Sequence, residues 1–472
     1  MKENVLLVYA PMDEYYFIEG VNDSPPLGLV VLQNYVTQKL GLQTKVDVID
    51  GEYYCLTEIL ELIENGHYDL VGVQSMMASY NNTLAILKKA KELDITTVMG
   101  GHHATQLAER IITNRSSLVD FIIAGDGEEA FAALIKGERL ENIPNLVYLH
   151  PKTKEIVRNK NKNVPIDDGM IDFFADKLLA QYKRKTRKNQ LERGEELSSF
   201  RSYSHKGCSN RLNSQYCFFC GRADRGVRFK TPEVYIKELQ HLASIPTTKY
   251  VFEIGDDFLQ SQEWLARVCE LKAKNMPANA IHLKIFARAN RITSEVIDYL
   301  KRLDIDEVAI GFESGSEKIL RRINKNALPA DNLRAAELLY ANGIDTIASF
   351  VLGLPGEDKK SLTETYEQAQ RVAELSYKHL GKAPQEVIAN LIEVNPGSPA
   401  YRKLEKAMPD KYLRADHLDV REVQDDYFSV LFNLISKDEL ESFRRELSKW
   451  GKQINKLGQY TYPAGWRRED LI

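Results

Sequence analysis

Cysteine is scarce in this chain, long apolar runs are missing, and neither sign of charge prevails. The 472 residues include five cysteines, and 63 basic against 67 acidic side chains leave a formal net charge of −4. A nearly neutral chain has no electrostatic reason to bind nucleic acid or a membrane surface, and no apolar stretch is long enough to span a bilayer. Asp13 and Glu14 interrupt the region where a signal peptide would lie, and a few unpaired cysteines suit a reducing compartment. We therefore expect a cytoplasmic protein, whose length allows two or three domains.

Three of the five cysteines stand close together, in the sequence GCSNRLNSQYCFFCG. Cys208, Cys217 and Cys220 provide one thiolate too few to close a tetrahedral structural site. They suit a cubane iron–sulfur cluster that leaves one iron open for a ligand. A zinc site completed by His205 or His241 is an alternative, and a dithiol redox pair is another. The cysteines alone favour the cluster and the zinc site about equally.

The chain after the cysteines alternates short apolar runs with helical patterns. Amphipathic helices separate five predicted strands, at residues 249–255, 281–288, 307–313, 346–352 and 386–392. Strands that are apolar throughout are typical of parallel sheets covered on both faces. About six such units predict a partial (β/α)6 barrel over residues 200–400, with ligand sites at the carboxyl ends of its strands.

Polar and glycine residues follow four of these strands at the point where each strand ends. One such turn is most often an ordinary connection, but four of them downstream of a cysteine triplet indicate a site. The residues are Glu253, Gly255, Asp256 and Asp257; Arg288 and Asn290; Gly311, Glu313, Ser314, Gly315 and Ser316; and Gly353 and Gly356.

As a set, these features resemble the radical S-adenosylmethionine (radical SAM) superfamily over roughly residues 200–401. The spacing Cys-x8-Cys-x2-Cys has a wider first gap than the usual Cys-x3-Cys-x2-Cys, and it is similar to wide-gap branches that include one modifying ribosomal peptides. The resemblance implies a [4Fe-4S] cluster on Cys208, Cys217 and Cys220, with SAM at its open iron. It also implies SAM contacts from Phe219, Glu253, Gly255, Asp256, Arg288, Glu313, Ser314 and Leu352.

Residues 1–150 are predicted to form a separate α/β unit. Helical patterns alternate with five predicted strands, at residues 5–11, 45–50, 70–75, 96–101 and 121–127. This order predicts a doubly wound, flavodoxin-like sheet of the Rossmann type. Small residues at the strand ends leave room for a large planar or phosphate-bearing ligand.

Three short sequences of this unit, SPPLGL, GGHHAT and GDGEE, resemble the cobalamin-binding domain that precedes many radical SAM domains. The motif Asp-x-His-x-x-Gly is absent, so the resemblance implies no histidine on the lower face of the cobalt. His102 and His103 are expected to shape their loop rather than to bind cobalt. The residues implied to line the cobalamin are Ser75, Met76, Gly100, Gly101, Gly125 and Glu128.

Two further regions connect and follow these units. Residues 151–199 are predicted to be a linker, whose basic run KRKTRK is expected to be a solvated face. Residues 401–472 are mainly helical and charged, and core packing is the ordinary reason for their apolar groups. We expect a helical cap that contacts the substrate. Its apolar groups are Leu434, Leu440, Phe443 and Leu447, and Tyr427, Phe428 and Phe432.

Two cofactors in one chain predict cobalamin-dependent C-methylation of an unactivated carbon. One SAM would methylate cobalt(I), and a second would be cleaved to a 5′-deoxyadenosyl radical. That radical would abstract hydrogen, and the substrate radical would take the methyl group from methylcobalamin. The alternative is a non-methylating radical reaction, such as ring contraction, cyclisation or epimerisation, with cobalamin auxiliary or absent.

Other classes of protein are less well supported. Cys55 and Cys269 are too few for a second cluster, which argues against methylthiotransferase chemistry. The intact cysteine triplet argues against a cobalamin sensor or carrier with an inactive barrel, and a zinc-stabilised binding protein remains the other alternative. We expect a small-molecule or peptide substrate, as in natural product biosynthesis, and flavodoxin or ferredoxin as the electron donor.

Overall fold

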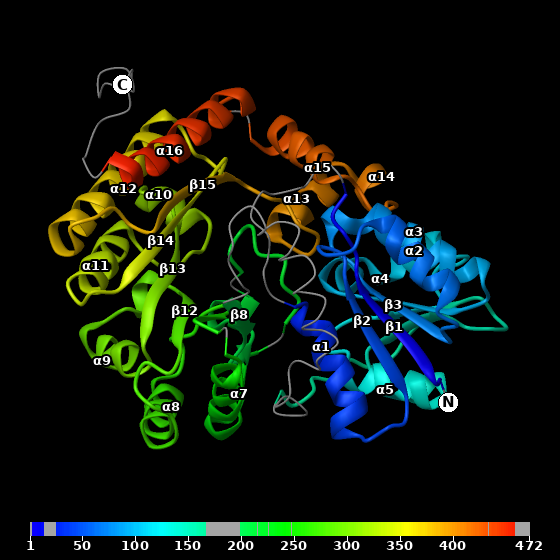
Figure 1. Ribbon diagram of the computed structural model, residues 1–472. Coiled ribbons are helices and arrows are strands. Elements are labelled where there is room, and N and C mark those ends of the chain that lie inside the picture. Colours follow the sequence, from blue (N-terminus) through cyan, green and yellow to red (C-terminus); the bar gives the residue numbers. More distant parts are fainter. Residues whose placement is uncertain are drawn as a thin grey trace.

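The computed structural model describes residues 2–13, 25–166, 199–214, 216–224, 226–246, 248–432 and 434–457. Two sheets of different kinds lie side by side, and helices near the C-terminus bridge them (Figure 1). The predicted basic run at residues 183–188 lies outside the described residues. No helix of the described chain combines the length and the apolar character needed to cross a membrane.

The first sheet is doubly wound, as predicted. Its parallel strands have the order β2-β1-β3-β4-β5, which is that of flavodoxin-like sheets. They are β1 (Asn4–Tyr9), β2 (Lys45–Asp50), β3 (Leu70–Gln74), β4 (Thr96–Gly100) and β5 (Phe121–Ile123). Two antiparallel strands that the sequence pattern did not predict extend the edge beyond β5, namely β6 (Leu146–Leu149) and β7 (Ile156–Arg158).

Helices cover both faces of this sheet. One face packs against α1 (Leu27–Asn34), which continues as the π-helix η2 (Tyr35–Lys39), and against α5 (Glu128–Lys136). The other face packs against α2 (Leu56–Asn65), α3 (Tyr80–Glu92) and α4 (His102–Asn114). The strands are apolar at nearly every position because side chains on both faces are buried.

The second sheet is open and entirely parallel, in the order β8-β11-β12-β13-β14-β15. Its strands are β8 (Ser199–Ser202), β11 (Tyr250–Glu253), β12 (His282–Ala287), β13 (Ile305–Glu313), β14 (Asp345–Leu352) and β15 (Glu386–Leu391). Five of the six were predicted, whereas β8 precedes the cysteines and its sequence SFRS is too short and polar to be recognised. The predicted fold class, a flavodoxin-like domain before a partial six-stranded barrel, is confirmed.

Helices between these strands lie on the outer face of the curved sheet (Figure 1). They are α7 (Pro232–Ser244), α8 (Gln262–Asn275), α9 (Ser294–Arg302), α10 (Glu317–Arg322), α11 (Pro329–Tyr340) and α12 (Lys359–Leu380). As predicted, α7 begins at an N-cap threonine: the hydroxyl of Thr231 accepts from the backbone N–H of Val234, and Pro232 is the first helical residue.

The C-terminal part is helical, as predicted. It comprises α13 (Pro399–Ala407), α14 (Pro409–Tyr412), α15 (Val420–Asp426), the π-helix η7 (Tyr427–Leu431) and α16 (Lys437–Leu457). Leu440, Phe443 and Leu447 of α16 are buried, together with Trp450, and this helix packs against β15. Leu434 was expected in the same stripe but is 60% exposed, because it lies in the turn before the helix begins.

The segment from α13 to α15 packs against the first domain (Figure 1). Arg110 of α4 forms an ion pair with Glu405 of α13 at 2.6 Å. Arg115 and Tyr80 both contact the carboxylate of Asp416, at 2.7 and 2.6 Å. These contacts fix the first domain beside the barrel, so that the carboxyl ends of the two sheets meet.

Candidate functional site

The three cysteines lie on a loop between residues 207 and 226. A two-stranded antiparallel ribbon closes the base of this loop, with one strand before it and one strand after it. The ribbon consists of β9 (His205–Lys206) and β10 (Arg228–Phe229), and it places Lys206 directly opposite Arg228. Gly207 starts the loop with a φ of +93°, and a Cβ there would lie 1.9 Å from the carbonyl oxygen of Gly226. Only glycine allows this approach, so the loop is tightly closed at its base.

Side-chain donors surround the thiols. Asn210 Nδ2 lies 3.1 Å from Cys217 Sγ, and Arg211 Nη1 lies 3.6 Å from Cys220 Sγ. Cys217 is buried, whereas Cys208 and Cys220 are partly exposed. Amide and guanidinium donors stabilise the charge on cluster thiolates and tune the reduction potential of iron–sulfur centres. The chemistry of this donor set fits an iron–sulfur cluster on the loop.

The zinc alternative finds no complete ligand set in the described part of the chain. Among the described residues, no three His, Cys, Asp or Glu side chains converge on a point that could hold a single metal ion. A cubane does not require such convergence, because each thiolate binds a different iron. Both ring nitrogens of His205 are engaged, since Nε2 accepts from the backbone N–H of Asp257 at 3.2 Å and Nδ1 lies 2.8 Å from Ser204 Oγ. Burial lowers the pKa of His205 to about 4, so the ring is neutral.

Glu253, predicted to contact SAM, has its carboxylate enclosed by protein donors. Its Oε1 accepts from the N–H of Ser204 at 2.7 Å, the hydroxyl of Ser204 at 3.0 Å and the N–H of Gly255 at 3.1 Å. Its Oε2 accepts from the hydroxyl of Tyr235 at 3.1 Å. The side chain is fully buried, and burial raises its pKa. Glu253 therefore holds the turn after β11 in shape, and a direct contact with SAM stays a prediction.

The second carboxylate of this turn, Asp256, is neutralised by the cysteine loop. Arg211 lies 2.7 Å from it and Arg222 lies 3.4 Å from it. Burial alone would raise the pKa of Asp256, but these two guanidinium groups lower it below its usual value. Asp256 is thus an ionised partner of the loop that carries the cysteines.

The third carboxylate, Asp257, is held less closely by the protein than the other two, with Arg291 Nε 3.8 Å from its Oδ2. It is fully buried, and among the described residues neither of its oxygens has a hydrogen-bond partner. Arg288, at the end of β12, likewise keeps Nη2 without a partner in the described part of the chain. Burial raises the pKa of Asp257 to about 6, although Arg288 and Arg291 oppose that shift.

Asp257 and Arg288 both lie near the first cysteine. Burial raises the pKa of the Cys208 thiol, which Asp257 raises further and Arg288 lowers. A buried carboxylate and a buried guanidinium, each with free hydrogen-bonding capacity, are complementary to an ammonium and a carboxylate. The pair fits the amino-acid end of SAM. The sequence analysis noted Asp257 at the strand end but could not distinguish it from Asp256.

The other predicted SAM contacts lie at the ends of β13 and β14. Glu313 has a φ of +60°, unusual for a residue with a side chain, and its Oε1 lies 2.6 Å from Lys325 Nζ. Ser314 Oγ lies 3.1 Å from Thr365 Oγ1 of α12. Leu352 is fully buried, and Phe219 of the cysteine loop is half-buried against the core.

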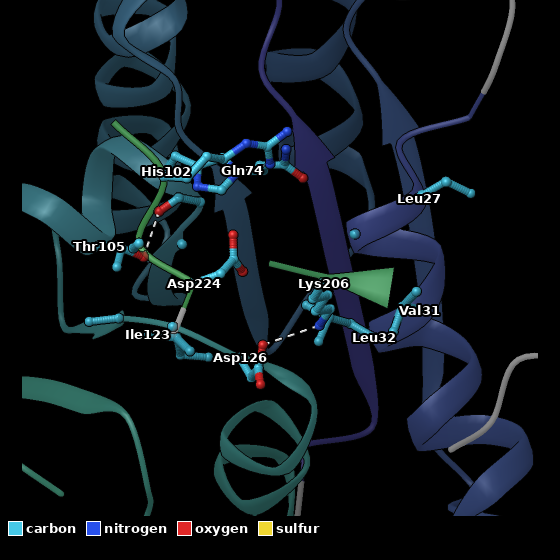
Figure 2. Close-up of a pocket in the computed structure, with 18 of the residues that line it drawn as sticks. Leu27, Val31, Leu32, Gln74, His102, Thr105, Ile123, Asp126, Lys206 and Asp224 are labelled. Carbon is cyan, nitrogen blue, oxygen red and sulfur yellow. Dashed lines mark hydrogen bonds and ion pairs between the residues drawn. The ribbon is translucent and has the colours of Figure 1, made fainter. Parts of the chain in front are cut away.

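A cavity of about 680 Å³ lies where the carboxyl ends of the two sheets meet. Figure 2 shows Leu27, Val31 and Leu32 of α1 on one side of this cavity, and Asp126 of the loop after β5 beside Lys206 of β9. The cavity therefore has an apolar part within the first domain and a charged part beside the cysteine loop.

Both sets of predicted residues contribute to this cavity. Five of the six predicted cobalamin contacts line it, and so do two predicted SAM contacts: Met76, Gly100, Gly101, Gly125 and Glu128, and Gly255 and Asp256. Ser75 is fully buried behind this wall, where its backbone N–H donates to the carbonyl of Gly100 at 2.8 Å.

The glycines of this wall fit a large planar ligand such as cobalamin. A Cβ on Gly100 would meet nothing closer than the carbonyl oxygen of Ile123 at 3.9 Å, so this strand end faces open space. Gly101 has a φ of +96°, and a Cβ there would lie 2.6 Å from the carbonyl oxygen of Ser75. The volume is within the usual range for cofactor sites.

The two histidines of the first domain have different surroundings. His102 lines the cavity, and its Nε2 accepts from Arg222 Nη1 at 2.9 Å. His103 is not among the lining residues; its Nε2 lies 3.2 Å from the carbonyl oxygen of Asp416, and its ring packs beside Tyr80. Burial lowers the pKa of His103 to about 3.

The sequence analysis missed an ionic network in the charged part of the cavity. Lys206 Nζ lies 3.2 Å from Asp126 and 3.0 Å from Glu128, and Arg228 Nη1 lies 2.5 Å from Asp126. No local pattern connects these residues, because Lys206 and Arg228 are 80 and 102 positions from Asp126 along the chain.

Comparisons with known proteins identify the same two domains. Residues 203–369 match the family model of the radical SAM superfamily, and residues 16–135 match that of the B12 binding domain. A Pyrococcus horikoshii protein named as an uncharacterised methyltransferase is 25% identical over 78% of this chain and 78% of its own length. An anaerobic magnesium-protoporphyrin IX monomethyl ester cyclase of Rubrivivax gelatinosus is 23% identical over 73% of this chain, but the match spans only 62% of the cyclase.

Among solved structures, the chain is similar to the cobalamin-dependent SAM radical enzyme OxsB with aqua-cobalamin and SAM bound. The TM-score is 0.67 at 17% sequence identity, and the match covers 87% of this chain and 61% of OxsB. At this identity the likeness shows that the two share a fold.

Proposed function

The chain belongs to the cobalamin-dependent radical SAM enzymes that carry a B12-binding domain, and we propose that it transfers a methyl group to an unactivated carbon. The cofactors of such an enzyme are a [4Fe-4S] cluster, SAM and cobalamin. When bound, the cluster supplies the electron that cleaves SAM reductively, and cobalamin supplies a cobalt centre that can carry a methyl group.

One observation carries the proposal: a single cavity is lined by the ends of both sheets. Gly100 of β4 and Gly255 after β11 face the same space of about 680 Å³. A ligand on the first domain and a ligand on the cysteine loop would therefore meet there, and a substrate carbon could reach both.

We propose a role for each group of residues. Cys208, Cys217 and Cys220 would hold the cluster, with Asn210 and Arg211 donating to the thiolates. Asp257 would accept from the ammonium of SAM and Arg288 would donate to its carboxylate, because each has unused hydrogen-bonding capacity. Further SAM contacts are proposed from Phe219, Glu253, Gly255, Asp256, Glu313, Ser314 and Leu352, and the cobalamin contacts from Ser75, Met76, Gly100, Gly101, Gly125 and Glu128.

A second function is favoured by the relatives named as cyclases, which match this chain over 73% and 67% of its length. The chain covers 62% and 52% of those proteins. In this alternative the enzyme closes a ring on its substrate by radical chemistry, without transferring a methyl group.

The experiment is an anaerobic assay with cluster- and cobalamin-loaded enzyme, SAM and a flavodoxin reducing system, analysed for nucleoside products. Methyl transfer predicts 5′-deoxyadenosine and S-adenosylhomocysteine in equal amounts, because one SAM is cleaved and another donates its methyl group. Formation of 5′-deoxyadenosine without S-adenosylhomocysteine would reject methyl transfer and favour the cyclase-like alternative.

A further inference from the structure

The ribbon at the base of the cysteine loop is too small to be stable alone. β9 and β10 pair through two residues each, and within the described chain they form a sheet of their own. A short two-stranded ribbon is marginally stable in water. This one also places Lys206 directly opposite Arg228, and like charges in that position destabilise a strand pair. The ribbon therefore needs support from elsewhere.

The barrel holds one side of the ribbon, with Phe229 packed beside Trp264 and His205 accepting from the N–H of Asp257, and the first domain holds its charged side. Asp126 lies between the two cations: its carboxylate is 2.5 Å from Arg228 Nη1 and 3.2 Å from Lys206 Nζ. Glu128 adds a second contact with Lys206, at 3.0 Å. The side chains of Asp126 and Glu128 are 8% and 6% exposed, so solvent screens these ion pairs only weakly.

Asp126 is itself held firmly in the loop after β5. The backbone N–H of Val164 donates to its carboxylate at 2.9 Å, and Asn145 Nδ2 donates to its carbonyl at 2.8 Å. Contacts within the first domain therefore help to fix its position, and Arg228 of the ribbon donates to the carbonyl of the same Val164 at 2.6 Å.

The first domain holds the loop at a second point, directly after the last cysteine. Gln106 Nε2 of α4 donates to the carbonyl of Gly221 at 2.9 Å, and His102 accepts from Arg222. Asp126, Glu128, His102 and Gln106 all line the cavity. The wall of the cobalamin site and the support of the cysteine loop are thus formed by the same side chains.

We propose that Asp126 is a positioning residue that couples cobalamin binding to assembly of the cluster on the cysteine loop. The inference rests on the assignment of the two cofactors and not on methyl transfer. Asp126 (Figure 2) and Glu128 line the cobalamin cavity and also form the ion pairs that hold Lys206 and Arg228 of the ribbon, so a cobalamin against this wall and a cluster on the loop would stabilise the same set of contacts. Because coupling between two sites is reciprocal, a loop ordered by its cluster strengthens cobalamin binding by the same factor.

The test measures the Kd of hydroxocobalamin for the full chain, by absorbance titration, with the cluster reconstituted and after its removal by a chelator. The wild type is expected to bind about tenfold more tightly with the cluster present. In Asp126→Asn, which keeps the shape but loses the charge, the two Kd values should agree within about twofold. Lys206→Met is a second variant that should abolish the difference from the opposite side of the ion pair.

Glu129→Gln is the matched control, since Glu129 pairs with Lys162 at 2.6 Å within the first domain and makes no described ion pair with the ribbon. It should retain the tenfold difference. Equal Kd values in the wild type, or an unchanged ratio in both Asp126→Asn and Lys206→Met with melting temperatures near that of the wild type, would overturn the proposal. No cobalamin binding by cluster-loaded wild type would overturn it together with the cofactor assignment, whereas absence of S-adenosylhomocysteine in the assay above would reject methyl transfer alone.

Discussion

The two parallel sheets of this chain differ in how their faces are covered. In β1 of the first sheet, Val5, Leu6, Leu7 and Val8 are at most 2% exposed, because helices pack on both faces. In β12 of the second sheet, buried and accessible positions alternate, and Phe286 is 38% exposed. A sheet covered on both faces can bind a ligand only beyond its strand ends, whereas a curved sheet covered on one face can also receive a substrate on its inner face.

The strand ends of the two sheets also differ in chemistry. The first sheet ends in glycines such as Gly100 and Gly101, which provide open space and backbone groups. The second ends in charged groups such as Asp257 and Arg288, beside the cysteines. The open space beside the glycines suits a large ring system such as cobalamin. The opposite charges of Asp257 and Arg288 suit the amino-acid end of SAM, which is a zwitterion. One cavity is thus lined by two sheets whose strand ends differ in chemistry.

The largest effect is expected from a change that removes the cluster but leaves the cobalamin wall of the first sheet intact. Cys217→Ser removes a proposed ligand, so iron content should fall severely and SAM cleavage should drop to the background level. Cobalamin should still bind, more weakly, because its wall belongs mainly to the first sheet. Iron and sulfide analysis with nucleoside quantification checks this, and Cys55→Ser, at an exposed cysteine, is the control. Full SAM cleavage in Cys217→Ser would contradict the assigned cluster site.

The second prediction concerns a substitution that blocks the proposed cobalamin site at the end of β4 and leaves the cysteine loop unchanged. Gly100→Leu should project a side chain into the cavity and weaken cobalamin binding about 100-fold, as expected for overpacking by 1–3 kcal/mol. The cluster content should remain, and Gly100→Ala should have a small effect because its Cβ would meet no atom within 3.9 Å. Titration with hydroxocobalamin measures both variants. Equal affinity of Gly100→Leu and wild type would show that cobalamin does not bind against this strand end.

A smaller effect is expected within the turn after β11, where three carboxylates follow one another closely. Asp257→Asn should weaken SAM binding about tenfold or more, since a hydrogen bond to a charged group contributes about 1.5–3 kcal/mol. Glu253→Gln should instead lower the melting temperature, because its carboxylate accepts four hydrogen bonds inside the protein. Calorimetric titration with SAM and thermal unfolding separate the two. Weaker SAM binding in Glu253→Gln, together with unchanged SAM binding in Asp257→Asn, would show that Glu253 is the SAM contact.

The smallest effect concerns a buried acid in the turn after β14. Burial raises the pKa of Glu357 from 4.5 to about 8, so between these values the folded protein keeps a proton that the unfolded chain has released. The free energy of unfolding therefore falls as pH rises through this window. Glu357→Gln cannot ionise, and it should melt a few degrees above the wild type near pH 8 but not near pH 5. Thermal unfolding at both pH values checks this, and an equal difference at both would contradict a neutral Glu357.

Much of the fold could be predicted because its signals are local. Apolar runs separated by helical patterns predicted ten of the parallel strands, and the cysteine spacing identified the loop. The strands β7 and β8 escaped because they are short and lie at sheet edges, and β6 escaped because it has only four residues, although three of them are buried. Leu434 was assigned to an apolar stripe because its spacing fits α16, but the helix begins three residues later, at Lys437.

The sequence was sufficient to show which residue types stand at each strand end: thiols on one loop, acids at the end of β11 and just after it, and glycines at the end of β4. It did not determine which acid is free. Glu253, Asp256 and Asp257 are nearly adjacent in the chain. Packing surrounds Glu253 with four hydrogen-bond donors and Asp256 with two guanidinium groups, whereas Asp257 has Arg291 3.8 Å away and no hydrogen-bond partner among the described residues. Likewise, Asp126 reaches Lys206 and Arg228 only through packing of the two domains, because hydrogen bonds and ion pairs depend on distance in space and not on separation along the chain.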